Sequence, residues 1–207
     1  MKQALAMKQA LATGPAAPAA LLRGSRLVYL MGASGSGKDT LLRGLRATLR
    51  PDEPVLVAHR YITRPSGADE ASVSLSAAEF ARRVALGCFS LHWDSHGLRY
   101  GIGIEIDSWL AGGAVVVVNG SRAHLAQAWA RYPDLAAVEV VADPQVLAQR
   151  LAQRGRETRE QIAERLRRAG RAVEAPADCA VIRLSNDGAP AEAAGRLLAL
   201  VRERLAA

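Results

Sequence analysis

The sequence of 207 residues is poor in lysine, cysteine and aromatic residues, and it has no long apolar run. Aromatic side chains make up only 4% of the chain, so the stacking residues interleaved with basic ones that are typical of single-strand nucleic-acid binding are missing. No apolar stretch approaches the roughly 20 residues of a membrane-spanning helix. Cys88 and Cys179 form neither a disulfide framework nor a metal-ligand pattern. We therefore expect a cytoplasmic protein that binds neither nucleic acid nor membranes.

The overall composition indicates a globular protein with a basic net charge. Half of them are apolar and 23% are charged, which is typical of a folded domain. The net charge is +7, and the basic residues are almost all arginine, because the chain has only three lysines. An excess of positive charge favours an anionic partner. Since the arginines are spread along the chain, we expect this partner to be a phosphorylated small molecule.

The chain is predicted to form one domain behind a short extension. Residues 1–24 repeat Met-Lys-Gln-Ala-Leu-Ala and then become rich in alanine and proline, so they are interpreted as a flexible extension. In residues 25–207, strands alternate with helices, which predicts an α/β fold whose mainly parallel sheet is flanked by helices. The stretch that ends at Gly103 is expected to be a glycine-rich loop, and residues 150–171 are expected to be helical and rich in arginine. Strands are expected at residues 26–31, 55–58, 89–93, 115–118, 137–141 and 180–184.

A glycine-rich motif follows the first predicted strand and opens a predicted helix. This is the context that a phosphate-binding P-loop requires, because glycines let the backbone wrap around phosphates and the helix N-terminus attracts negative charge. The lysine that ends the motif is expected to contact the β- and γ-phosphates of ATP. The motif consists of Gly32, Ala33, Ser34, Gly35, Ser36, Gly37 and Lys38.

The residue after the P-loop lysine departs from the usual pattern. A serine or threonine commonly stands there and binds Mg²⁺ through its hydroxyl, whereas this chain has Asp39 followed by Thr40. A carboxylate beside a triphosphate is repulsive unless a cation lies between them. We therefore predict that Asp39 contacts Mg²⁺, directly or through water, and that Thr40 assists.

From Arg26 to Leu205 the chain resembles the guanylate-kinase family. The likeness implies a guanylate-kinase-like P-loop NTPase fold, an acceptor-binding region at about residues 59–103 and a helical lid at about residues 150–171. It also implies that Arg154 and Arg165 act on the transferred phosphoryl group from the lid. The matching positions are Thr63-Arg64-Pro65, Gly87, Phe89, Tyr100-Gly101, Arg150, Arg154-Gly155, Arg165 and Ser185-Asn186-Asp187.

The positions that read guanine in that family are different here. Leu91 stands where guanylate kinases have a glutamate, and leucine cannot accept hydrogen bonds from a base. Ser121 replaces a second acid, and Arg60 replaces a small hydroxyl residue. Gly67 and Val73 replace an arginine and a tyrosine that hold the monophosphate. The donor half of the pattern is therefore retained, whereas the guanine half is rebuilt.

Residues 57–64, 101–107 and 118–125, together with the Gly-Lys-Asp ending of the P-loop, are similar to the ribose 1,5-bisphosphate phosphokinases. This resemblance implies transfer of the γ-phosphoryl group of ATP to ribose 1,5-bisphosphate, giving 5-phosphoribosyl 1-diphosphate during phosphonate breakdown. An acceptor with two phosphates and no base agrees with the loss of the acidic positions and the gain of arginines.

The resemblance and the motifs together assign residues to three groups. Phosphoryl transfer is assigned to Lys38, Arg154 and Arg165. ATP binding is assigned to the P-loop with Asp39, Thr40, Arg150 and Asn186, and Mg²⁺ to Asp39 and Thr40. The phosphosugar acceptor is assigned to Arg60, Arg64, Tyr100, Asn119, Ser121 and Arg122.

Two other functions and the oligomeric state stay open at this point. A guanylate or other nucleoside monophosphate kinase is disfavoured by Leu91 and Ser121. A non-catalytic guanylate-kinase-like binding module is disfavoured because such modules can lose the P-loop lysine and the lid arginines, which this chain retains. The sequence does not decide between a monomer and a homodimer.

Overall fold

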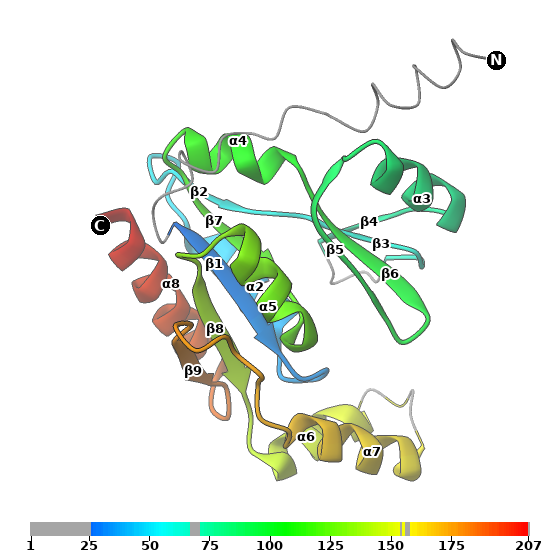
Figure 1. Ribbon diagram of the computed structural model, residues 1–207. Coiled ribbons are helices and arrows are strands. Elements are labelled where there is room, and N and C mark those ends of the chain that lie inside the picture. Colours follow the sequence, from blue (N-terminus) through cyan, green and yellow to red (C-terminus); the bar gives the residue numbers. More distant parts are fainter. Residues whose placement is uncertain (1–25, 67–70, 154, 156–157, 207) are drawn as a thin grey trace, which may run out of the picture.

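The computed structural model describes residues 26–66, 71–153, 155 and 158–206 (Figure 1). Its centre is a five-stranded sheet with the order β2-β7-β1-β8-β9, and every neighbouring pair in this sheet is parallel. The predicted mainly parallel sheet is confirmed. Its strands are β1 (Leu27–Gly32), β2 (Val55–Val57), β7 (Val115–Asn119), β8 (Ala136–Val141) and β9 (Val181–Ser185).

Helices cover both faces of this sheet, which explains why its strands are continuously apolar. Alternate residues of β1 belong to two separate apolar clusters: Tyr29 packs in the cluster that includes α4 and α5, and Leu30 packs in the cluster that includes α2 and α8. No helix in the described part of the chain is long and apolar enough to cross a membrane. The flanking helices are α2 (Lys38–Thr48), α4 (Glu105–Ala111), α5 (Leu125–Arg131) and α8 (Pro190–Ala206), and the 3₁₀ helix η2 (Arg122–His124) precedes α5.

A second, four-stranded sheet lies beside the first and has the order β4-β3-β6-β5 (Figure 1). Its β3–β4 pair is parallel, and its other two pairs are antiparallel. This mixed sheet and its helix occupy most of the stretch that the resemblance assigns to the acceptor. The elements are β3 (Arg60–Ile62), β4 (Ser72–Ser74), α3 (Ala77–Ala85), β5 (Phe89–Ser95) and β6 (Leu98–Gly103).

The glycine-rich stretch that ends at Gly103 is a strand, so its prediction as a loop is wrong. A hairpin joins β5 to β6 through His96 and Gly97, both of which have positive φ (53° and 73°). Such turns match the twist of two antiparallel strands. Gly101 is needed within β6 because a Cβ there would lie 2.7 Å from the ring of Phe89 on the paired strand. The glycine therefore marks a close side-chain approach within a sheet, and not a loop.

The arginine-rich segment at residues 150–171 contains parts of two helices, so the predicted helical segment is interrupted. They are α6 (Pro144–Gln153) and α7 (Arg159–Ala169), and Figure 1 shows both beyond the ends of β1 and β8. A new helix starts because Thr158 and Gln161 form a capping box, in which each side chain accepts a hydrogen bond from the other residue's backbone N–H. Arg154, which was assigned to catalysis, lies outside the described residues.

Candidate active site

The P-loop connects β1 to α2, and its backbone leaves the start of α2 open. Gly37, the residue before the helix, has φ of 92°, and no side chain caps the first turn. A Cβ at Gly37 would clash with the side-chain amide of Asn186. Glycine is therefore required by both backbone conformation and space. Because the first N–H groups of a helix have no intrahelical acceptor, this loop presents donors to an anion.

The ammonium group of Lys38 lies across the P-loop. Its Nζ donates hydrogen bonds to the carbonyl oxygens of Gly32 at 2.8 Å and Ala33 at 3.0 Å. The charge is therefore held beside the backbone amides where phosphate oxygens are expected to bind. This position agrees with the predicted role of Lys38, which remains a prediction.

Three side chains from distant segments meet the P-loop. Asn186, which follows β9, donates from Nδ2 to the Ser36 carbonyl at 2.8 Å. Arg165 of α7 donates from Nη1 to the Ser34 hydroxyl at 2.6 Å. Nη1 of Arg150 is buried near Gly37 and has no hydrogen-bond partner among the described residues. Leaving a buried guanidinium donor without a partner costs free energy. An anion bound at the P-loop would supply the missing acceptor, so this part of the site is suited to an anion.

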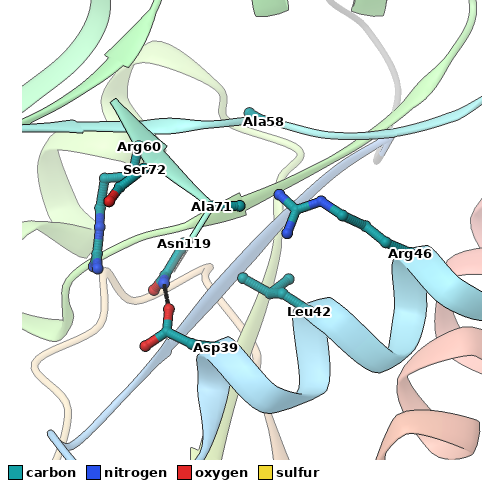
Figure 2. A pocket seen from close by; sticks show the side chains of 8 residues that line it. All are labelled: Asp39, Leu42, Arg46, Ala58, Arg60, Ala71, Ser72 and Asn119. Carbon is teal, nitrogen blue, oxygen red and sulfur yellow. Dashed lines mark hydrogen bonds between the residues drawn. The ribbon is translucent and has the colours of Figure 1, made fainter. Parts of the chain in front are cut away.

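Asp39 and Asn119 form the other edge of the site. Nδ2 of Asn119 donates to Oδ1 of Asp39 at 2.9 Å (Figure 2). Asn119 is 5% exposed, and its Oδ1 has no partner within the described part of the chain. A carboxylate and a spare amide oxygen are suitable for a hard cation. No group of three or more His, Cys, Asp or Glu that could hold a metal exists among the described residues, so further oxygen ligands would have to come from a substrate or water. Thr40 is exposed.

A pocket opens between α2 and the mixed sheet (Figure 2). Asp39 and Asn119 line it together with Arg60 from β3 and Arg46 from α2. The guanidinium of Arg60 lies 5.2 Å from the ring centroid of Tyr100, so the predicted acceptor residues Arg60, Tyr100 and Asn119 lie close to one another. Arg46 was missed from the sequence. Its only signal there is its spacing of seven residues from Asp39, which places both side chains on one face of a helix.

The position that reads guanine in guanylate kinases lies in an apolar environment. Leu91 on β5 is 4% exposed and belongs to the same core cluster as Trp93 and Ile102. The leucine side chain has no group that could hydrogen-bond to a base. The correspondence of Leu91 to the guanine-reading glutamate stays a prediction.

Ser121 lies at the end of β7, where its backbone is held by a buried tyrosine. The hydroxyl of Tyr29 donates to the Ser121 carbonyl at 3.0 Å and accepts from the Ser121 N–H at 2.9 Å. Burial raises the pKa of Tyr29 to about 12. Tyr29 therefore stays protonated and can serve as both donor and acceptor. The contacts recorded for Ser121 involve its backbone, and its predicted binding of the acceptor stays a prediction.

Arg122 contacts α7, one of the two helices in the predicted lid. Its guanidinium donates to the carbonyl oxygens of Arg168 at 2.8 Å and Ala169 at 3.0 Å, at the C-terminal end of α7. The carboxylate of Glu139, which is 7% exposed, lies 3.6 Å from Nη1 of Arg122. A cation at a helix C-terminus is favourable because the last carbonyls have no intrahelical donors. These contacts indicate that Arg122 holds α7 in place, and they do not support its predicted role as an acceptor ligand.

Arg64 follows β3, at the edge of the mixed sheet. Its Nη1 donates to the Pro65 carbonyl at 2.9 Å, and its own carbonyl accepts from the Ser74 hydroxyl at 2.8 Å. Arg64 does not line the pocket between α2 and the mixed sheet. Its assignment to the acceptor stays a prediction.

A P-loop before α2, a flanking mixed sheet and the helix pair α6 and α7 define a guanylate-kinase-like P-loop fold. A crystal structure of guanylate kinase from Anaplasma phagocytophilum matches with a TM-score of 0.58 and 16% identity, covering 87% of this chain and 88% of that one. At the sequence level, ribose 1,5-bisphosphate phosphokinase PhnN of Achromobacter xylosoxidans is 65% identical over 184 residues, which are 89% of this chain and 96% of that protein. The protein of the same name from Burkholderia mallei is 52% identical over 87% of this chain and 97% of its own length.

The chain therefore belongs to the ribose 1,5-bisphosphate phosphokinase PhnN family, which is a family of kinases. A scan against protein-family profiles finds no match. The resemblance predicted from residues 57–64, 101–107 and 118–125 is confirmed at the level of the family.

Proposed function

We propose that this protein transfers the γ-phosphoryl group of ATP to the 1-phosphate of ribose 1,5-bisphosphate, giving 5-phosphoribosyl 1-diphosphate and ADP. The observation that carries the proposal is the combination of a P-loop with a pocket that contains two arginines, Arg46 and Arg60. This pocket offers positive charge, whereas a guanine site needs a paired acceptor at the position of Leu91. The names of the relatives support the same acceptor.

The donor side of the proposal rests on the P-loop and the groups that meet it. The backbone N–H groups at the start of α2 would bind the ATP phosphates, and Lys38 would neutralise the β- and γ-phosphates. Arg165, already in contact with Ser34, would contact the transferred group. Arg150 would supply its buried donor to the phosphates. Asn186 would keep the loop in place through its bond to Ser36.

Mg²⁺ is included in the proposal because Asp39 and Asn119 offer it two oxygen atoms, Oδ2 of Asp39 and the unpaired Oδ1 of Asn119. Mg²⁺ usually binds through one or two carboxylates together with substrate phosphates and water. The ion would supply neutralisation of the charge on the β- and γ-phosphates. The position of Asp39 directly after Lys38 places its carboxylate beside those phosphates.

The reaction needs no general base. A bond forms between the γ-phosphorus of ATP and an oxygen of the acceptor's 1-phosphate, and the bond from that phosphorus to the β–γ bridging oxygen breaks, with its electron pair leaving on ADP. The attacking oxygen belongs to a phosphate that is largely ionised at neutral pH, so no proton has to be removed. Positioning and charge neutralisation therefore provide the catalysis.

An ADP-release assay with ribose 1,5-bisphosphate and with GMP tests the proposal directly. We expect turnover with the bisphosphate, and ³¹P spectra of the product should show a new diphosphate on C1 of the ribose. Turnover of GMP at a comparable kcat/KM, or none with the bisphosphate, would overturn the proposed acceptor. ATP without any acceptor is the control for simple hydrolysis.

A further inference from the structure

The pocket between α2 and the mixed sheet is lined along one side by α2. Asp39, Leu42 and Arg46 follow one another along a single face of this helix, and all three line the pocket (Figure 2). With a rise of 1.5 Å per residue, the backbone positions of Asp39 and Arg46 are separated by about 10 Å along the axis. Leu42, which is 4% exposed, lies between them as an apolar surface. The pocket therefore has a P-loop end at Asp39 and a distal end at Arg46.

Arg46 is a half-buried cation whose charge has little compensation. Its Nη2 donates to the carbonyl of Val57 at 3.3 Å, and no carboxylate lies within ion-pair distance of its guanidinium among the described residues. Burial lowers the pKa of Arg46, and the Asp39 carboxylate partly offsets this effect. A guanidinium has five N–H donors in a planar fork, so most of its donor capacity remains for a group in the pocket.

The reacting end of the acceptor is determined by the donor. Phosphoryl transfer requires the 1-phosphate to lie beside the γ-phosphate, at the end of the pocket formed by Asp39 and Asn119. The ribose then extends along Leu42, and its 5-phosphate reaches the distal end. A dianionic phosphate matches the fork of a guanidinium.

We propose that Arg46 binds the 5-phosphate of the acceptor and thereby selects a sugar that carries phosphates at both ends. This inference rests on the proposed function, because it uses the same acceptor and the same reacting end. It adds a specificity residue on α2, which is the helix that also carries Lys38 and Asp39. The P-loop helix thus contacts both substrates, the donor through its N-terminus and the acceptor through the Arg46 face.

Binding of three sugars to wild type and Arg46→Met tests the inference by titration calorimetry, which does not depend on turnover. The sugars are ribose 1,5-bisphosphate, ribose 5-phosphate and ribose 1-phosphate. Methionine keeps an unbranched apolar chain but removes the charge. We expect the dissociation constants of the two sugars with a 5-phosphate to rise about 10- to 100-fold, as for loss of a hydrogen bond to a charged group. The dissociation constant for ribose 1-phosphate should change less than about twofold, because this sugar has no 5-phosphate and so loses no hydrogen bond to Arg46.

Arg43→Met is the matched control, since Arg43 is an exposed arginine on the same helix. All three dissociation constants should stay at their wild-type values in this variant. Equal weakening of ribose 1-phosphate in Arg46→Met would show a general disturbance of the pocket, and unchanged binding of ribose 5-phosphate would place the 5-phosphate elsewhere. Either result overturns the role of Arg46. Failure of the proposed function appears separately, as absent ADP release from the bisphosphate by the wild-type enzyme.

Discussion

The P-loop and the pocket beside α2 meet at Asp39, and they are built from different parts of the chain. The P-loop consists mainly of backbone: open N–H groups, glycine conformations and carbonyls that hold Lys38. The pocket consists mainly of side chains, and Arg46, Arg60 and Asn119 give it charge and polarity. A site of backbone amides recognises phosphate in any nucleotide, whereas side chains can be exchanged singly. The difference explains how a guanylate-kinase-like fold can keep its donor and change its acceptor.

The strongest test of the donor region is Lys38→Ala. We expect kcat to fall about 10²- to 10³-fold, because a preorganised cation beside the transferred group is lost. The melting temperature should change little, since the hydrogen bonds of Nζ to Gly32 and Ala33 lie within the loop itself. Steady-state kinetics and thermal unfolding measure the two effects. Normal turnover in this variant would remove the P-loop from the mechanism.

Asp39→Ser tests the residue where the two regions meet. The variant has the hydroxyl that usually follows the P-loop lysine, but it lacks the carboxylate. We expect half-saturation by Mg²⁺ to move about 10- to 100-fold higher, which is the range for disturbed metal sites. Asn119→Ala, which removes the hydrogen-bond partner of Asp39, should move it less. A Mg²⁺ titration identical to wild type in Asp39→Ser would exclude the carboxylate from the metal site.

Arg122→Ala distinguishes a lid contact from an acceptor contact. Loss of its hydrogen bonds to α7 should loosen the lid and lower kcat about tenfold, which corresponds to about 1.4 kcal/mol in the barrier. Trypsin should then cut within the arginine-rich α7 faster than in wild type. Arg183→Ala is the control, because Arg183 pairs with the same Glu139 but is 71% exposed and makes no side-chain hydrogen bond or ion pair to α6 or α7 among the described residues. If only the KM of the acceptor increased, Arg122 would instead be a ligand of the acceptor.

Tyr29→Phe should have the smallest effect on activity and a measurable effect on stability. The Ser121 N–H and carbonyl would lose their partner, which costs about 1–3 kcal/mol and lowers the melting temperature by roughly 2–10 °C. Because the folded pKa of Tyr29 is raised to about 12 from its ordinary value of 10, its contribution is complete below pH 10 and is lost as pH rises from 10 to 12. The free energy of unfolding of wild type should therefore fall more steeply than that of Tyr29→Phe in this range. Parallel slopes would contradict this assignment.

Much of the central sheet could be predicted because its signals are local. The valine run at residues 115–118 and the P-loop motif each identify a strand or a strand–helix junction without knowledge of the partners. The strand β6 could not be recognised, since Gly101 looks like a loop residue until Phe89 is placed over it. The break between α6 and α7 has a local sequence signal in the capping pair Thr158 and Gln161.

In the candidate site, too, the sequence predicts local motifs but not tertiary contacts. Lys38 and Asp39 are adjacent in a motif, so the sequence alone shows that they lie close together. Arg46 joins the site because it lines the same pocket as Arg60 of β3, and this is a tertiary arrangement without a motif. The resemblance pointed to Arg122 as an acceptor ligand, but a single sequence does not reveal that the end of α7 would lie against it.

The turn after β7 serves several parts of the molecule within four residues. Asn119 bonds to Asp39, Ser121 is held by Tyr29, and Arg122 holds the end of α7. Because Tyr29 binds both backbone groups of Ser121, the middle of this turn is fixed to β1 in the core. Only three peptide bonds separate the residue that orients Asp39 from the residue that contacts the end of α7. The turn thus joins the P-loop helix and α7 to one buried strand.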